Sequence, residues 1–292
     1  MIGPPEGALV KGSKQSAVDH NLAYELLSAA QIRQRFPAFQ PTDNMVAVWE
    51  PRAGVLFPEL AIQTHLELAA KNGAILRFDQ PIERWEPHGT DVRVFTGNAS
   101  YQARQLILSA GAWIGSLIPE MHLPLEIERQ VLCWFEPASH AELFAPDRLP
   151  IFIMEYAASR FFYGFPDVGD GVKAALHHQG KPIQPDNQRR EASDEEARAV
   201  RQVLERFLPR APGRLLSAVV CMYTNAPDSH FIFGRHPRCS QVLIVSPCSG
   251  HGFKFSAVIG ELAATVLANK VPPYDLSLFS PERLTAQSAQ IP

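Results

Sequence analysis

QVLIVSPCSGHGFKFSAVIGELAATVLAN, residues 241–269, is the stretch of sequence that decides the fold. Its apolar, β-branched start predicts a buried strand, Gly250 and Gly252 mark a loop, and a helix is expected from about Phe255 to just before Asn269. A loop that joins the carboxyl end of a strand to a helix N-terminus is a favoured place for an anionic cofactor. The stretch therefore predicts an α/β fold.

The residues before this stretch predict one more helix and a series of short strands. AIQTHLELAAKNG, residues 61–73, has helical spacing and a C-terminal Gly73. The segments at 74–78, 92–97 and 106–111 read as strands, because β-branched residues alternate or run continuously between turn residues. The apolar stripe of the helix comprises Leu60, Ile62, Leu66, Leu68 and Ala69. We expect the order helix, strand, hairpin, buried strand.

A second strong helix is predicted from about Ser193 to Phe207. Ser193 and Glu196 have the S-x-x-E spacing of a capping box, and Pro209 follows the end. The residues expected to face inward are Ala197, Val200, Val203, Leu204 and Phe207.

Composition excludes several classes of function. The chain has 292 residues, of which 46% are hydrophobic, with a net charge of −3 and scattered basic residues, so we expect a globular protein that binds neither nucleic acid nor an anionic membrane. No apolar run approaches the roughly 20 residues of a membrane span, and residues 1–12 lack the features of a signal peptide. The four cysteines form no CxxC pair and suggest no metal site. We expect a cytoplasmic protein with a small-molecule partner.

Three stretches, taken together and in order, resemble one family of flavoenzymes. They are FYGFP (162–166) followed by GVKAALHHQG (171–180), then CMYTNAPDSHFIFGRHP (221–237), then SGHGFKFS (249–256). This combination resembles the monomeric sarcosine oxidase and N-methyl-L-tryptophan oxidase family of FAD-dependent amino-acid oxidoreductases. Supporting similarity is found in RFPAF (35–39), WEPRAGVLFPE (49–59), LILSAGAW (106–113) and ERQVLCWFE (128–136).

The resemblance implies an α/β fold with α+β character and two interleaved domains. Residues 1–50 and 126–228 would form a substrate domain with a mainly antiparallel sheet. Residues 51–125 and 229–292 would form the remainder of a Rossmann-like FAD-binding domain, which is incomplete because the sequence contains no G-x-G-x-x-G turn. We expect a monomer.

The implied activity is oxidation of the C–N bond of a secondary or N-methyl amino acid, with O2 as acceptor and an imine or aldehyde and hydrogen peroxide as products. The sequence does not name the substrate, because sarcosine-like, aromatic and cyclic amino acids differ mainly in the pocket volume they need. A dehydrogenase that passes electrons to a protein acceptor stays open as an alternative.

Catalytic roles are implied for Lys173, His177 and Tyr163, each by its match to a family position. Lys173 matches the lysine near the reactive nitrogen of the flavin, where a fixed positive charge favours the electron transfer to O2. His177 matches the active-site histidine, and Tyr163 an aromatic residue that lines the substrate cavity. From the residues alone, a solvated lysine and structurally satisfied His and Tyr side chains remain open.

Substrate binding is implied for Lys254 and Tyr223. Lys254 matches the lysine that pairs with the substrate carboxylate. A helix-start lysine is the alternative, but a cation is electrostatically unfavourable at that helix end, which hints at an anion nearby.

The implied cofactor is FAD, bound covalently through Cys221 as a thioether in an intact enzyme. A cysteine in the apolar segment SAVVCMYT, residues 217–224, would otherwise read as a small buried core residue. The other predicted flavin-binding residues are Ser249, Gly250, His251, Gly252 and Phe253. The two glycines would allow close backbone approach to a flat ring or phosphate, and His251 would present its backbone N–H to the flavin.

The missing glycine turn leaves a second hypothesis open. Because pyrophosphate needs close backbone N–H groups, the chain could be an N-terminally truncated, non-catalytic remnant that binds no FAD. We favour Met1 as an internal methionine of a longer protein, because Lys173, Cys221 and Lys254 are all present in one chain.

Overall fold

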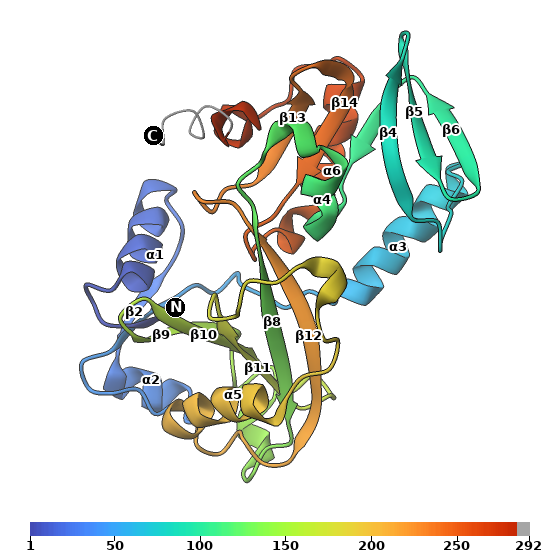
Figure 1. Ribbon diagram of the computed structural model, residues 1–292. Helices are drawn as coiled ribbons and strands as arrows, with labels where there is room; N and C mark the ends of the chain where they lie inside the picture. Colours follow the sequence, from blue (N-terminus) through green and yellow to red (C-terminus); the bar gives the residue numbers. More distant parts are fainter. Residues whose placement is uncertain (285–292) are drawn as a thin grey trace, which may run out of the picture. The chain divides into compact units, whose positions relative to one another are not determined.

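The computed structural model describes residues 1–284 and divides into two compact units (Figure 1). The first comprises Met1–Val55, Glu128–Pro182 and Asp186–Met222. The second comprises Leu56–Ile127, Ile183–Pro185 and the residues from Tyr223 onward. The assignment of substrate binding and flavin binding to separate domains stays a prediction.

The first unit is organised on an eight-stranded sheet with the strand order β12-β8-β11-β10-β9-β1-β3-β2. The strand pairs β8–β11, β11–β10, β10–β9, β1–β3 and β3–β2 are antiparallel, and β9 and β1 run parallel. The expected mainly antiparallel sheet is therefore confirmed. The strands are β1 Ile2–Gly3, β2 Glu25–Ser28, β3 Val46–Trp49, β8 Glu126–Phe135, β9 Phe152–Ala157, β10 Arg160–Phe165, β11 Val172–His177 and β12 Leu215–Asn225.

Helices α1 (Ala8–Asp19), α2 (Ala29–Arg35) and α5 (Asp194–Phe207) accompany this sheet. The predicted capping box of α5 is confirmed: the Ser193 side chain accepts a hydrogen bond from the Glu196 backbone, and the Glu196 carboxylate accepts one from the Ser193 N–H at 2.7 Å. The predicted inward face is confirmed too. Four of its five residues are buried, and Val203 is half-buried against the same core.

Aromatic side chains fill the core beneath the sheet. The Phe152 ring lies edge-on to Phe39 at 4.9 Å between centroids and to Phe162 at 5.4 Å, and Phe162 also contacts Phe207 of α5. Burying a phenylalanine side chain contributes about 1.5–3 kcal/mol, so this cluster fixes which face of the sheet α5 covers. Helix α5 does not cover the opposite face of the sheet.

The second unit contains the predicted strand–loop–helix. Strand β14 (Cys239–Ser246) pairs antiparallel with β13 (Ile232–His236) and parallel with β7 (Leu106–Leu108), and α6 (Ser256–Leu267) follows the glycine loop. The α6 helix packs its buried Leu262 and Ala263 against β13 and β14. The fold class, a mixed α/β protein, is therefore confirmed.

A three-stranded antiparallel sheet and helix α3 (Pro58–Lys71) complete the regular part of this unit (Figure 1). The sheet consists of β4 (Ile82–His88), β5 (Asp91–Thr96) and β6 (Ala99–Ala103). The remaining short elements are α4 Ile114–Leu117 and the 3₁₀ turns η1 Gly111–Trp113, η2 Pro119–Met121, η3 Ala141–Phe144, η4 Pro185–Asn187, η5 Phe253–Phe255 and η6 Ser277–Phe279.

Two expectations for this unit need correction. The segment 74–78 is irregular and not a strand, because no strand within residues 1–284 pairs with it and Ile75 stays 81% exposed. Helix α3 forms as predicted, but none of its residues is buried, so its apolar stripe covers no core in the described chain. The spacing of apolar residues predicted the helix, but it could not predict whether another element packs against it.

Within residues 1–284, no helix is both long and apolar enough to cross a bilayer.

Candidate active site

One face of the first unit's sheet carries Lys173, His177 and Tyr163. In the register of β10 and β11, Tyr163 lies opposite Ala175 and Phe165 lies opposite Lys173. Side chains alternate between the two faces of a strand, so these residues project together, while Phe162 and Ala174 project into the core. The three residues predicted as catalytic therefore share one sheet face.

The Lys173 ammonium lies against two aromatic rings. Its Nζ is 4.8 Å from the centroid of Trp134, the residue opposite it on β8, and 5.1 Å from the centroid of Phe165 on β10. Two such cation–π contacts, each worth about 0.5–1 kcal/mol or more, hold the charge at a defined place on a half-buried surface. This placement differs from the freely solvated lysine that was left open.

Tyr163 and His177 contact each other on the same face. Their rings are perpendicular, with centroids 5.8 Å apart, and Tyr163 also contacts Phe165 edge-on at 6.0 Å. The His177 ring also contacts the His178 ring, with centroids 4.2 Å apart. Sequence reasoning missed Trp134, Phe165 and His178. The two-residue period of a strand could have predicted that Phe165 shares a face with Tyr163. The place of Trp134 could be known only from the register of β8 and β11.

Cys221 lies on β12 and is exposed, so the alternative of a buried core cysteine is wrong. Its Sγ lies 3.7 Å from the Met222 carbonyl oxygen. The other cysteines, at positions 133, 239 and 248, are buried. Burial raises the pKa of the Cys133 thiol to about 11, with a smaller contribution from Glu196. Cys221 is thus the cysteine that solvent or a cofactor can reach.

The loop that carries Ser249 and Gly250 is locked to the end of β12. The Ser249 N–H donates to the Thr224 carbonyl at 2.7 Å, and the Ser249 Oγ accepts from the Ala226 N–H at 3.2 Å. Ser249 and Gly250 both have positive φ, at 63° and 76°. A Cβ on Gly250 would lie 2.8 Å from the Tyr223 ring, so Tyr223 packs directly on this glycine.

The two glycines have local reasons to be glycine. Besides the Tyr223 contact at Gly250, a Cβ on Gly252 would lie 1.8 Å from the Pro247 carbonyl oxygen. The close approaches present in the structure are therefore to the protein itself. The expected approach to a flavin ring or phosphate stays a prediction.

His251, Phe253 and Lys254 are exposed at the start of η5. The His251 Nε2 bonds to the Ser229 carbonyl at 2.9 Å, and the Lys254 Nζ donates to the His251 carbonyl at 2.9 Å. Partial burial lowers the pKa of Lys254 below its ordinary value of 10.5. The carbonyl gives the ammonium a local acceptor, so its unfavourable position at a helix start does not by itself require an anion.

Each unit, taken by itself, carries groups whose chemistry suits FAD. An exposed thiol at Cys221 suits a thioether, and the backbone N–H groups of Gly250 and His251 donate to no acceptor within residues 1–284. Such donors suit the electron-rich edge of a flavin. The structure brings together Lys173, His177 and Tyr163 in one unit, and Tyr223, Ser249 and Gly250 in the other.

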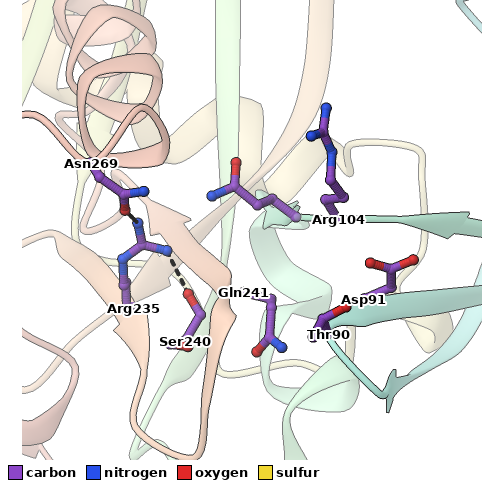
Figure 2. A pocket seen from close by; sticks show the side chains of 8 residues that line it. Thr90, Asp91, Arg104, Arg235, Ser240, Gln241 and Asn269 are labelled. Atoms are coloured by element: carbon purple, nitrogen blue, oxygen red, sulfur yellow. Dashed lines mark hydrogen bonds between the residues drawn. The ribbon is translucent and has the colours of Figure 1, made fainter.

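A separate hollow of about 630 Å³ lies in the second unit and contains none of the predicted site residues (Figure 2). Its lining is polar and comprises Thr90, Asp91, Arg104, Gln105, Arg235, Ser240, Gln241 and Asn269. The Arg235 guanidinium points toward Ser240 and Asn269 and donates to both, which engages it within the protein.

Comparison with known proteins identifies the family. The family model described as FAD dependent oxidoreductase matches residues 6–266. The chain is 39% identical to monomeric sarcosine oxidase of Streptomyces avermitilis, over 99% of this chain and 76% of that protein. It is 34% identical to N-methyl-L-tryptophan oxidase of Yersinia pestis, over 96% of this chain and 74% of that protein.

Solved structures share the fold. NikD, an amino acid oxidase of nikkomycin biosynthesis, aligns with a TM-score of 0.80 at 18% identity, over 96% of this chain and 75% of its own. L-proline dehydrogenase from P. horikoshii aligns with a TM-score of 0.81 at 17% identity, over 100% of this chain and 77% of its own. The long family match and the identity above one third together show that this chain belongs to the FAD-dependent oxidoreductase family.

Proposed function

We propose that this chain oxidises the C–N bond of a secondary or N-methyl amino acid such as sarcosine and uses O2 as the electron acceptor. For sarcosine the balanced reaction consumes O2 and water and gives glycine, formaldehyde and hydrogen peroxide. Bound FAD would accept the two electrons that are removed, with the hydrogens of the carbon and the nitrogen, when the C–N single bond becomes an imine, which water then hydrolyses. The names of the relatives at 34–39% identity support this substrate class.

The observation that carries the proposal is the sheet face with Lys173, Tyr163 and His177. A cation held between two aromatic rings provides a fixed positive charge, and O2 gains negative charge as it is reduced. We propose that Lys173 stabilises that charge. Tyr163 and His177 would line the substrate side and exclude water from the reacting bond.

In the second unit we propose that Lys254 binds the substrate carboxylate. Its ammonium uses one donor on the His251 carbonyl, which leaves other N–H groups for an anion. Tyr223 would border the same ligand. Cys221 would form the covalent bond to FAD, and Ser249, Gly250, His251, Gly252 and Phe253 would contact the cofactor through their loop.

The test is an absorbance spectrum of the purified chain between 350 and about 500 nm, repeated after acid precipitation. A flavin band that stays with the pellet supports covalent FAD. Peroxide formed in air with sarcosine, N-methyl-tryptophan, proline or pipecolate supports the oxidase. Reduction of a dye without peroxide would indicate a dehydrogenase, and a chain with neither flavin nor turnover would be the non-catalytic remnant.

We further propose a monomer, in line with the name of the sarcosine oxidase relatives. Size-exclusion chromatography with light scattering would give a mass near 32.4 kDa for a monomer and twice that for a dimer.

A further inference from the structure

The turn that follows β11, residues 178–180, is held in place by several backbone and side-chain contacts. His178 has a positive φ of 53°, which non-glycine residues rarely adopt. A Cβ on Gly180 would lie 1.6 Å from the Arg129 carbonyl oxygen, so the backbone of the turn packs directly on β8. The Gln179 side chain accepts a hydrogen bond from the Tyr156 hydroxyl at 2.7 Å.

The buried carboxyl group of Glu128 organises the same turn. Its Oε1 accepts from the Gly180 N–H at 2.6 Å and from the Gln130 side-chain amide at 2.7 Å. Its Oε2 lies 3.3 Å from Nδ1 of His178. Glu128 is only 5% exposed, so this group is committed to the turn and not to solvent.

This turn also contacts His177, the last residue of β11. The centroids of the His178 and His177 rings are 4.2 Å apart with an interplanar angle of 61°, and the Tyr163 ring lies 5.8 Å from the His177 ring. The His177 ring therefore contacts two other rings, and one of those is oriented by a buried carboxyl group.

We infer that Glu128 and His178 are positioning residues that hold the His177 ring in its working orientation. The inference rests on the proposed role of His177 and deepens it. A displacement of about 1 Å from the productive geometry can lower the rate up to roughly 100-fold. We expect the rate of reduction to fall about tenfold here, because Tyr163 still restrains the His177 ring.

The main variant is His178→Asn in the full chain. Asparagine tolerates positive φ and can place an amide donor where Nδ1 of histidine lies, so the turn and its bond to Glu128 are kept while the ring contact is lost. A second variant, Glu128→Gln, keeps the ring and changes the group that orients it. The matched control is Glu155→Gln, another buried acidic residue of the same unit, whose carboxylate accepts from the Leu9 N–H.

Two readouts separate positioning from a general loss of stability. The first is the ring signals of His177 in a long-range ¹H–¹⁵N spectrum of histidine-labelled protein, assigned by their absence in His177→Asn. They should move in both test variants and stay in place in Glu155→Gln. The second is rapid-mixing kinetics: reduction by sarcosine should slow about tenfold, with reoxidation by O2 unchanged.

Each outcome decides something definite. Unmoved His177 signals in both variants would overturn the inference, whatever the kinetics. Moved signals in Glu128→Gln, which keeps the His178 ring, together with slower reduction support it, and moved signals with unchanged reduction would overturn it. A wild-type chain without flavin or turnover would refute the proposed function, and the spectrum alone would then decide whether Glu128 and His178 hold the His177 ring.

Discussion

The two units present their candidate residues in different ways. In the first unit, Lys173, His177 and Tyr163 project from inner strands of the sheet, each of which pairs with a neighbouring strand on both sides, so their identity can change while the sheet stays intact. In the second, Gly250 and Gly252 belong to a loop whose path is possible only because glycine has no Cβ atom. Substitutions of Lys173, His177 or Tyr163 should therefore change chemistry, and substitutions of the two glycines should change structure.

The largest effect is expected for Gly252→Ala. The φ of −81° at Gly252 suits alanine, but the new Cβ would lie 1.8 Å from the Pro247 carbonyl oxygen, so the backbone itself must move. We expect a loss of about 3 kcal/mol in the free energy of unfolding and weaker flavin retention. Urea unfolding followed by circular dichroism measures the first quantity.

The control for that variant is Gly260→Ala in α6, where nothing lies within 4 Å of the new Cβ. Alanine favours helix over glycine by up to about 1 kcal/mol, so this variant should be as stable as wild type or more so. Equal losses in both variants would show that the loop is not set by its close approach to Pro247.

Next in size is Lys173→Met, which removes the cation and leaves the sheet unchanged. We expect flavin reoxidation by O2 to slow about 100-fold and reduction by substrate to change much less, because negative charge develops on O2 during reoxidation whereas the amine loses electrons during reduction. Stopped-flow absorbance separates the two half-reactions. Lys181→Met, at an exposed lysine outside the predicted site, should reoxidise at the wild-type rate. Unchanged reoxidation in Lys173→Met would remove Lys173 from this role.

A smaller effect is expected for Lys254→Met, with KM for a carboxylate substrate raised about tenfold and kcat little changed. Burial lowers the Lys254 pKa, so the ammonium is lost at a lower pH than for an ordinary lysine of pKa 10.5. In the wild type, KM should accordingly rise with pH before that value is reached. In Lys254→Met the same profile should be flat over this range, and parallel profiles would contradict carboxylate binding.

Local patterns predicted those features of the fold that depend on neighbours in sequence. The capping box of α5 and the buried face of that helix are examples, since both follow from residues three or four apart. Helix α3 and the segment 74–78 show the limit. The same spacing rules predicted an apolar stripe and a strand, but burial and pairing depend on partners that spacing does not specify.

The candidate site shows the same limit. The i, i+4 spacing on one strand was enough to place Lys173 and His177 on one face. The rings of Trp134 and Phe165 around Lys173 depend on the alignment of three strands, and the Glu128–His178 contact joins residues 50 positions apart. Neither could be predicted without the sheet register.

The smallest effect on folding is expected for Cys221→Ser. The thiol is exposed, so a hydroxyl in its place should change the free energy of unfolding by no more than about 0.5 kcal/mol. Cys133→Ser places the same hydroxyl in a fully buried site of the neighbouring strand and should cost about 1–3 kcal/mol. The flavin should respond in the opposite order. After acid precipitation it should pass to the supernatant in Cys221→Ser and stay with the pellet in Cys133→Ser, because only an accessible sulfur can form the thioether. Flavin retained by Cys221→Ser would mean that another residue holds it.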